Sequence, residues 1–511
     1  MRNKLMKNIL LFCDTIVVDI VLNLTKHLVK QNYFVYLQCE KIDTKKRISN
    51  FLLKNNIEKN FEIICLHEYL LENYSTKFEE IDFLNFEKKY NCKLSDINIS
   101  TSEFNIYHNF FKKYESKLDI EYHLSARILL IENFYNFYFK NTKIDFALVE
   151  CRNHFNTISG ILFFKKNNIP CYVPTSSIFK DYFSVNEVQD IKNPFLEENY
   201  LSKDFNLENI KELKKELDNI SFKRSTNDRE KNYLRNRFET LKRNIFNMIY
   251  NFIKYMLNYN KFSLIKNFYL GNIHPVDLLK SRINKRINYY FYKKKLNERS
   301  TFSKKKKCVF FLGLSPEAST YSQCNIFFDQ RKVARFIALN LPNDYELIVK
   351  EHPSQYISSD GRNSNYYDEI LSHYNIKLAK PEDKAIDLIK NSNFVITSTG
   401  SVGIETILLK KKLIMLGNNH YKIFKNLYKA ENYSILKNII SELTEQKSEI
   451  NTDKEQETEI LKFLSSYKKS YFPGNIEIFY KKKFLSHDDY EFELEKISNS
   501  FLKIINKLIS N

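Results

Sequence analysis

A run of small, hydroxyl-bearing residues, Ser398-Thr399-Gly400-Ser401-Val402-Gly403-Ile404-Glu405, follows the apolar residues 394–397. Small residues let an anion approach the backbone, and the N–H groups and dipole at a helix start favour negative charge. A carboxylate one turn into the helix can accept hydrogen bonds from a ribose. The spacing favours phosphate binding; the alternative is an ordinary Ser/Thr helix cap with glycine for close packing. The phosphate-binding candidates are Ser398, Thr399, Gly400, Ser401 and Gly403, with Glu405 as the ribose candidate.

A second polar group, Lys350-Glu351-His352-Pro353, ends the apolar residues 345–350. An imidazole at this position could donate to a departing phosphate or act as a general acid. The ammonium group of Lys350 could balance the phosphate charge. The alternative is a solvated strand end whose histidine has a structural role.

A third polar group, residues 314–320, follows the apolar residues 308–312 and contains Glu317. A carboxylate there could deprotonate an attacking hydroxyl group. The alternative is a Pro-Glu pair that begins a helix. Ligands of open α/β sheets bind beyond the carboxyl ends of the strands. Three polar loops after three strands therefore predict one shared site.

The apolar pattern predicts two α/β domains that could position these groups. In the N-terminal part we expect a strand at the beginning of residues 8–22, followed by a helix that runs to residue 30. Further strands are expected at 33–38, 144–150 and 169–174, and 45–140 is expected to be mostly helical. In the second part we expect strands at 308–312, 345–350, 376–378, 394–397 and 412–416. Helices are expected at 330–341, 385–391 and 402–410, and 425–511 is predicted to be helical.

Glycine is scarce in the chain, and most of it lies in the same region as the three polar motifs. The chain has eight glycines, of which five lie between residues 308 and 421. Glycine adopts backbone conformations that other residues avoid, and it allows close approach. Its clustering indicates that this region has strict backbone requirements.

The positive charge of the chain is concentrated in one stretch. The 511 residues carry a formal charge of +19, and residues 221–307, with 23 Lys/Arg and five Asp/Glu, account for +18. This stretch is also rich in Phe and Tyr and poor in Gly and Pro, which predicts helices. We expect it to rest on an anionic membrane surface; the alternative is a solvated helical linker. It has no nucleic-acid recognition motif, so no nucleic acid is expected as a partner.

The cysteine pattern and the length of the apolar runs together predict where in the cell the protein is found. The eight cysteines show no CxxC pair, which argues against a zinc site and against a disulfide framework. No uninterrupted apolar run approaches the ~20 residues needed to span a bilayer. The prediction is a cytoplasmic protein, peripheral to the inner face of the cytoplasmic membrane.

The four motifs together resemble the capsule (surface) polysaccharide biosynthesis family. The resembling run is SPEAST…FFDQ…LPNDYELIVKEHPSQY…NFVITSTGSVGIETILLKKKLIMLGNNHY, within residues 308–421. A Pro-Glu-Ala loop, an Asp-Gln pair, a Lys-Glu-His-Pro strand end and a Thr-Gly-Ser-x-Gly-x-Glu helix start occur in that order. The resemblance does not extend into the basic stretch.

The resemblance implies a GT-B-like fold, with two Rossmann-like domains facing a cleft and a helical basic insert between them. The implied domains are an acceptor domain at 1–200, a connector at 201–307, a nucleotide-sugar domain at 308–424 and a helical region at 425–511. By position, His352 would stabilise the departing phosphate, residues 398–401 would bind it, and Glu405 would lie near the ribose. Glu317 and Gln330 become active-site candidates, and Asp14 is a rival to Glu317 as the base.

The implied activity is a glycosyltransferase that uses a nucleotide-activated sugar, CMP-linked and Kdo-like, and a glycan or lipid-linked acceptor. The nucleotide sugar is a co-substrate; no other cofactor and no metal is expected. One alternative is a polyol-phosphate transferase with a CDP-glycerol-type donor. Another is a non-catalytic polysaccharide-binding or export factor.

Overall fold

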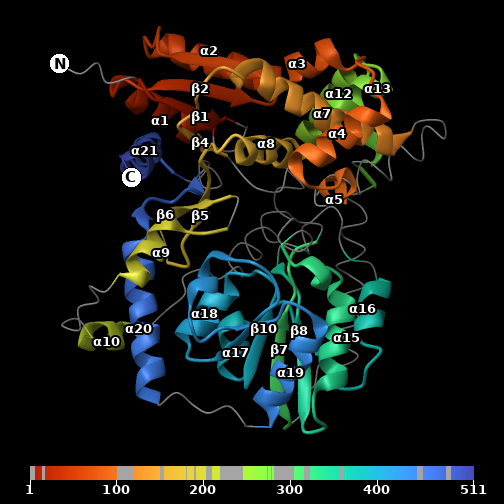
Figure 1. Cartoon of the computed structure of the whole chain (residues 1–511), viewed down its shortest axis with the longest axis vertical. Helices are drawn as coiled ribbons and strands as arrows, with labels where there is room; N and C mark the ends of the chain where they lie inside the picture. The colour runs from red at the N-terminus through yellow and green to blue at the C-terminus, as the bar shows by residue number, and fades with distance from the viewer. Residues whose placement is uncertain are drawn as a thin grey trace. The chain divides into compact units, whose positions relative to one another are not determined.

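The computed structural model of the chain forms two compact units (Figure 1). Unit 1 comprises Met1–Glu198, Phe262–Asn272 and Lys469–Asn511, and unit 2 comprises Asn199–Lys261 and Ile273–Lys468. The structure describes residues 6–13, 18–99, 119–149, 155–179, 181–188, 191–202, 210–218, 245–272, 274–277, 279–280, 304–315, 323–353, 355, 362, 364–445, 453–478 and 485–510.

Unit 1 is built on a mainly parallel sheet of order β13-β6-β5-β4-β1-β2-β3 among the described residues. Its strands are β1 (Asn8–Phe12), β2 (Phe34–Cys39), β3 (Phe61–Cys65), β4 (Phe146–Leu148), β5 (Cys171–Ser176), β6 (Tyr182–Glu187) and β13 (Phe472–Pro473). The pairs between β1, β2, β3, β4 and β5 are parallel, whereas β6 and β13 add antiparallel pairs at one edge.

Helices cover both faces of this sheet. They are α1 (Val18–Lys30), α2 (Ile42–Lys54), α3 (Leu66–Asn73), α4 (Glu80–Tyr90), α5 (Leu94–Ile99), α7 (Ile120–Phe139), α8 (Phe155–Lys166), α9 (Pro194–Leu201), α13 (Leu264–Tyr269) and α21 (His487–Ser510). Because side chains alternate along a strand, Ile9 and Leu11 face the core shared with α1 and α21. The other face of the sheet meets α7 and α8: the ring of Phe12 contacts that of Phe164 in α8, and the ring of Tyr36 contacts that of Phe139 in α7.

Unit 2 is built on a fully parallel sheet of order β12-β11-β10-β7-β8-β9 among the described residues. Its strands are β7 (Lys306–Phe311), β8 (Tyr345–Lys350), β9 (Ile376–Leu378), β10 (Phe394–Thr397), β11 (Lys412–Met415) and β12 (Tyr428–Lys429). β8 and β10 are buried along their whole length, as expected of strands covered on both faces.

The helices of unit 2 fall on both sides of its sheet (Figure 1). One face packs on α15 (Gln330–Asn340), α16 (Ser364–Ile370) and α19 (Tyr433–Thr444). α18 (Val402–Leu408) contacts β10 and β11, and α17 (Ala385–Lys390) contacts α18. The other elements are α10 (Ile210–Asp218), α12 (Ile245–Tyr259), α20 (Asp453–Lys469) and the short 3-10 turns Asn325–Phe327 and His420–Ile423.

The prediction of two Rossmann-like α/β domains is confirmed, since each unit is a helix-covered, mainly parallel sheet. That the two face a cleft stays a prediction. The strands expected in both parts are present. The expectation that 45–140 is mostly helical was wrong at β3, whose FEIIC run forms a parallel edge strand beside β2.

The division of the chain also differs from the expected domains. Within the predicted connector 201–307, Phe262–Asn272 belongs to unit 1. The predicted helical region 425–511 includes β12 and β13 and is split, because α20 belongs to unit 2 whereas β13 and α21 complete unit 1. β13 pairs with β6, and the Tyr490 hydroxyl of α21 donates to Asp19 of α1 over 2.9 Å.

Helix α21 should be essential to the stability of unit 1. Phe501 is 1% exposed and its ring lies 4.7 Å from that of Phe183, whereas Phe492 on the same helix is 69% exposed. We predict that Phe501→Ala destabilises unit 1 by about 3–5 kcal/mol because it leaves a cavity. Phe492→Ala is the matched control and should leave the thermal unfolding transition in place. Equal shifts for both variants would contradict this packing.

Candidate functional site

Parallel register brings the predicted loops to one edge of the unit 2 sheet. Phe311, the last residue of β7, is paired with Thr397 of β10 and with Lys350 of β8. The chain therefore leaves all three strands at the same level, into residues 312–315, 398–401 and 351–353. β8 and β10 lie on opposite sides of β7, so strand order reverses there. Such a switch point is where open α/β sheets bind ligands.

The loop after β10 is held through three successive carbonyl groups. The carbonyl of Ser398 accepts from the N–H of Gly417 over 3.0 Å, and that of Thr399 accepts from the side-chain amide of Asn419. The carbonyl of Gly400 accepts from the Tyr421 hydroxyl over 2.8 Å. In a trans peptide the N–H of the next residue points opposite to the carbonyl. The N–H groups of residues 399–401 consequently face away from these contacts, as a phosphate cradle requires.

Two glycines are needed for this arrangement. A Cβ atom on Gly403 would collide with the ring of Tyr421, the residue that holds the Gly400 carbonyl. A Cβ atom on Gly417 would lie 2.7 Å from Cγ2 of Thr399 and 2.8 Å from the carbonyl oxygen of Gln323. Gly403 is thus required for close packing against Tyr421, and its part in phosphate contact stays a prediction.

The hydroxyl groups of the loop differ in their surroundings. Ser398 is buried, and its Oγ lies beside the thiol of Cys324, a weak partner, with no other hydrogen-bond partner among the described residues. Burial raises the pKa of Cys324 to about 12, so it stays a thiol. Ser401 is exposed, and its side chain does not cap α18. Both hydroxyls are therefore placed to serve a ligand.

The strand end after β8 contains a buried ion pair. Nη1 of Arg362 donates to Oε1 and Oε2 of Glu351 over 2.7 and 2.8 Å, and both side chains are almost completely buried. The Tyr367 hydroxyl donates to the same carboxylate over 2.7 Å. Burial alone would lower the pKa of Arg362, but the charge of Glu351, the neighbouring Tyr366 and Tyr367, and the hydrogen bond to Glu351 together outweigh it, so the pKa is raised. The guanidinium therefore stays charged.

This ion pair connects two of the three loops. Oε1 of Glu351 accepts from the backbone N–H of His352 over 2.6 Å, and Nη2 of Arg362 donates to the carbonyl of Gly313 over 2.7 Å. Burial, and after it the positive charge of Arg362, lowers the pKa of His352 to about 4. The imidazole is accordingly neutral at pH 7, so it can donate a hydrogen bond but does not carry a proton to transfer as a general acid.

Two glutamine side chains hold the loop after β7. The Gln330 amide accepts from the N–H of Gly313 over 2.5 Å and donates to its carbonyl over 3.2 Å. The Gln355 amide makes the same two-way contact with Ser315, each bond 2.8 Å long. Gln330 is therefore a positioning residue for the segment that leads toward Glu317. Glu317 itself and Asp14 lie outside the described residues.

Lys350 makes contacts that the sequence did not predict, and its part in phosphate binding stays a prediction. It is buried, and its Nζ donates to the backbone carbonyls of Lys380 and Pro381, the latter over 2.9 Å. The ammonium group holds the loop after β9. Glu405, on the first turn of α18, is half-buried. Sequence reasoning missed Arg362, Gln355 and Tyr421, because their side chains act on loops distant in sequence.

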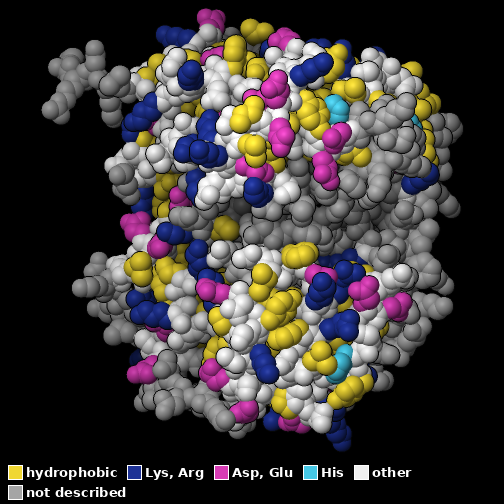
Figure 2. All heavy atoms as spheres, turned by 45° about the vertical axis from the view of Figure 1, so that its right-hand side comes forward, with side chains coloured by type: hydrophobic (Ala, Val, Ile, Leu, Met, Phe, Trp, Pro, Cys, Tyr) yellow, Lys and Arg dark blue, Asp and Glu magenta, His cyan; other side chains and the backbone are white. Residues whose placement is uncertain are grey.

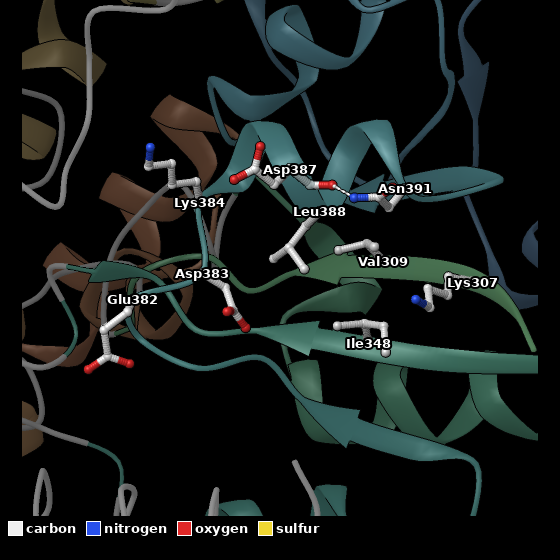
Figure 3. A pocket seen from close by; sticks show the side chains of 9 residues that line it. All are labelled: Lys307, Val309, Ile348, Glu382, Asp383, Lys384, Asp387, Leu388 and Asn391. Carbon is white, nitrogen blue, oxygen red and sulfur yellow. Dashed lines mark hydrogen bonds between the residues drawn. The ribbon is translucent and has the colours of Figure 1, made fainter. Parts of the chain in front are cut away.

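A cavity of about 310 Å³ lies elsewhere in unit 2, against the β7–β8 face beside α17 (Figure 3). Val309, Ile348 and Leu388 form its apolar floor, and Lys307, Glu382, Asp383, Lys384, Asp387 and Asn391 complete its lining. None of the predicted site residues lines this cavity, so we do not assign it to the same chemistry. Among the described residues, no cluster of three or more His, Cys, Asp and Glu side chains could hold a metal ion.

The buried ion pair should control the stability of the site. We predict that Arg362→Gln destabilises unit 2 by about 3–5 kcal/mol, because it leaves the Glu351 carboxylate buried without its cation. The double variant Glu351→Gln, Arg362→Met should recover much of this loss. Lys429→Gln, in the exposed pair with Glu431, is the control and should leave thermal unfolding unchanged. A double variant as unstable as Arg362→Gln would contradict the buried-charge explanation.

Comparison with known proteins places the site in a family. Residues 218–425 match the family model described as capsule polysaccharide biosynthesis protein. The match covers less than half of the chain, but it includes the three loops and the whole basic stretch 221–307. The family pattern thus begins about 90 residues before the motifs that suggested it.

Solved structures show only distant likeness. A Thermosulfurimonas dismutans KpsC, beta Kdo 2,4 transferase, is 11% identical with a TM-score of 0.34, over 63% of this chain and 79% of that chain. The beta Kdo 2,7 transferase of the same KpsC is 11% identical with a TM-score of 0.28, over 60% and 74%. A Neisseria meningitidis UDP-GlcNAc 2-epimerase bound to UDP-GlcNAc is 12% identical with a TM-score of 0.23, over 98% and 100%.

No curated protein matches the chain. The family assignment therefore depends on the match over residues 218–425 and on the motifs within it. The resemblance predicted from the four motifs is confirmed, because residues 218–425 match the family model described as capsule polysaccharide biosynthesis protein.

Proposed function

We propose that the protein is a glycosyltransferase of capsular or surface polysaccharide synthesis, transferring a sugar from a nucleotide donor to a glycan or lipid-linked acceptor. The observation that carries this proposal is the meeting of the three motif loops at the switch point of the unit 2 sheet. These loops lie within the segment that matches the family.

The donor phosphate is proposed to lie against residues 398–401 and His352. The N–H groups of residues 399–401 face away from their internal contacts, and the buried Ser398 hydroxyl lacks a strong partner among the described residues. A neutral His352 would donate a hydrogen bond to a phosphate oxygen. As negative charge builds on the leaving phosphate, the hydrogen bond from the neutral imidazole N–H strengthens, so His352 stabilises that charge when it is greatest.

The remaining residues have supporting roles in the proposal. Glu405 would accept from the ribose, while Lys350 and Gln330 would hold the loops after β9 and β7 rather than touch the donor. The base that takes the acceptor proton is proposed to be Glu317 or Asp14. In the mechanism the acceptor oxygen bonds to the sugar carbon, the bond from that carbon to the phosphate oxygen breaks, and the nucleotide leaves.

The donor is proposed to be CMP-linked and Kdo-like, which the resemblance of the motifs to the capsular Kdo transferases supports. The competing function is a polyol-phosphate transferase with a CDP-glycerol-type donor, because such enzymes also use a His-Pro strand end and a Ser/Thr-rich helix start. A donor panel separates them. We predict release of CMP from the sugar donor and no label transfer from CDP-glycerol. The reverse pattern would select the polyol-phosphate transferase. Nucleotide binding without turnover on any acceptor would favour a non-catalytic protein.

The proposed location is cytoplasmic and peripheral to the inner face of the membrane. Among the described helices, none is both long and apolar enough to cross a bilayer. The charge of +18 in residues 221–307 supports attraction to an anionic surface. A protein at this surface would meet a lipid-linked acceptor directly.

Ser398 gives a direct test of the phosphate site. We predict that Ser398→Ala weakens donor binding about 10–100-fold, the cost of one hydrogen bond to a charged group, measured by calorimetry. Thermal stability should stay equal or rise, because the variant removes a buried hydroxyl without a strong partner.

Ser392→Ala is the matched control. Ser392 is buried in the same unit, but its hydroxyl already donates to the carbonyl of Ile389 over 2.8 Å. The control should lose about 1 kcal/mol of stability and keep donor affinity. If Ser398→Ala were instead less stable with unchanged donor affinity, the hydroxyl would be structural and the proposed site wrong.

A further inference from the structure

Helix α12 carries an apolar stripe on its exposed side. Tyr250, Ile253 and Leu257 are 65%, 50% and 62% exposed. Their spacing of three and four residues places them on one side of an α-helix. Large apolar side chains that gather on one face, rather than scatter singly, mark an interaction surface.

The opposite side of α12 is held by the protein. Tyr259 is buried, and its ring meets that of His274 edge-on, with centroids 5.3 Å apart. The segment that begins at His274 adds two more exposed apolar side chains, Val276 and Leu279. The helix is thus anchored by one side while its apolar stripe faces outward.

The length and composition of α12 decide how it could meet a membrane. Its 15 residues make a helix about 22 Å long, shorter than the ~30 Å hydrocarbon core of a bilayer. Its charged residue is Lys254, which is exposed next to the stripe, and Lys261 is exposed just beyond the helix end. Such a helix lies in the interface plane, with apolar groups among the acyl chains and lysines at the headgroups.

The sequence charge of the stretch that contains α12 indicates which kind of surface the helix would meet. The helix lies within residues 221–307, which carry +18, whereas the rest of the chain has a balance of +1. Figure 2 shows Lys/Arg and Asp/Glu side chains interspersed over the described parts of the displayed face. We infer that α12 docks the protein on an anionic lipid surface by inserting Tyr250, Ile253 and Leu257 between headgroups.

A second helix shows why charge matters to this inference. Ile81 and Leu84 of α4 are also exposed, at 55% and 51%. Their neighbours Glu79, Glu80 and Asp82 are acidic, so an anionic surface would repel α4. The α4 pair therefore supplies a matched control with similar apolar exposure and opposite local charge.

The first test is sedimentation with vesicles of phosphatidylcholine alone or with added phosphatidylglycerol. We predict that the full chain binds only the anionic vesicles and that part of the binding survives high salt, because insertion is apolar. Tyr250→Gln, Ile253→Gln, Leu257→Gln should weaken binding at least tenfold; Gln keeps helix propensity. Ile81→Gln, Leu84→Gln should bind as the wild type does. Equal loss in both variants, or none in the α12 variant, would overturn the inference.

The second test does not depend on the folding of the triple variant. The chain contains no tryptophan, so Leu257→Trp introduces a single fluorescent reporter. Its emission should shift to the blue when anionic vesicles are added, whereas Leu84→Trp should not shift. A shift of Leu257→Trp with rising protein concentration alone would assign the stripe to a second copy of the chain and overturn the lipid assignment.

The inference deepens the membrane location in the proposed function but does not depend on sugar transfer. Activity on a water-soluble acceptor should be the same in the α12 variant and the wild type. Loss of vesicle binding with retained transfer, or the reverse, therefore distinguishes failure of one proposal from failure of the other.

Discussion

The site depends on one buried ion pair, Glu351 with Arg362. Two charges without water need hydrogen bonds as well as each other. The carboxylate also accepts from Tyr367 and from the backbone of His352, and the guanidinium donates through Nη2 to the carbonyl of Gly313. Nε of Arg362 has no hydrogen-bond partner among the described residues. Because these contacts join the ends of β7 and β8, the pair fixes the relative positions of two loops. Burial, and after it the positive charge of Arg362, lowers the pKa of His352 and keeps its imidazole neutral.

The three loops can form one site only because the sheet places their strand ends side by side. The parallel register of β7, β8 and β10 brings three strand ends to one level, and strand order changes at β7. Open α/β sheets bind ligands at such a switch point. Small groups then complete the arrangement: Gln330 and Gln355 hold the loop after β7, and Gly417, Asn419 and Tyr421 hold the loop after β10. The result is a rigid edge with backbone N–H groups directed to one side.

Much of this could be predicted from the sequence because the cues are local. The runs CVFFL, YELIVK and FVIT are short, apolar and followed by polar motifs, which predicts both the strands and the shared edge. Long-range partners gave no such cue. Arg362 is 11 residues from Glu351, Tyr421 is 21 residues from Gly400, and β13 joins a strand almost 290 residues earlier. β3 was missed because its short apolar run lies between helices, where periodicity alone does not separate strand from helix. The contacts of Lys350 and Gln330 with neighbouring loops were not predicted, because a polar side chain near a site can hold the loops as well as contact a ligand.

The central claim is that the edge formed by β7, β8 and β10 binds the phosphate of a nucleotide. The most direct measurement is a crystal structure of the full chain with a cytidine nucleotide. The account predicts a phosphate oxygen within about 3.2 Å of a His352 ring nitrogen. It also predicts contact with the Ser398 hydroxyl and the N–H groups of residues 399–401. A phosphate bound in the cavity beside α17, or against the sheet of unit 1, would contradict it.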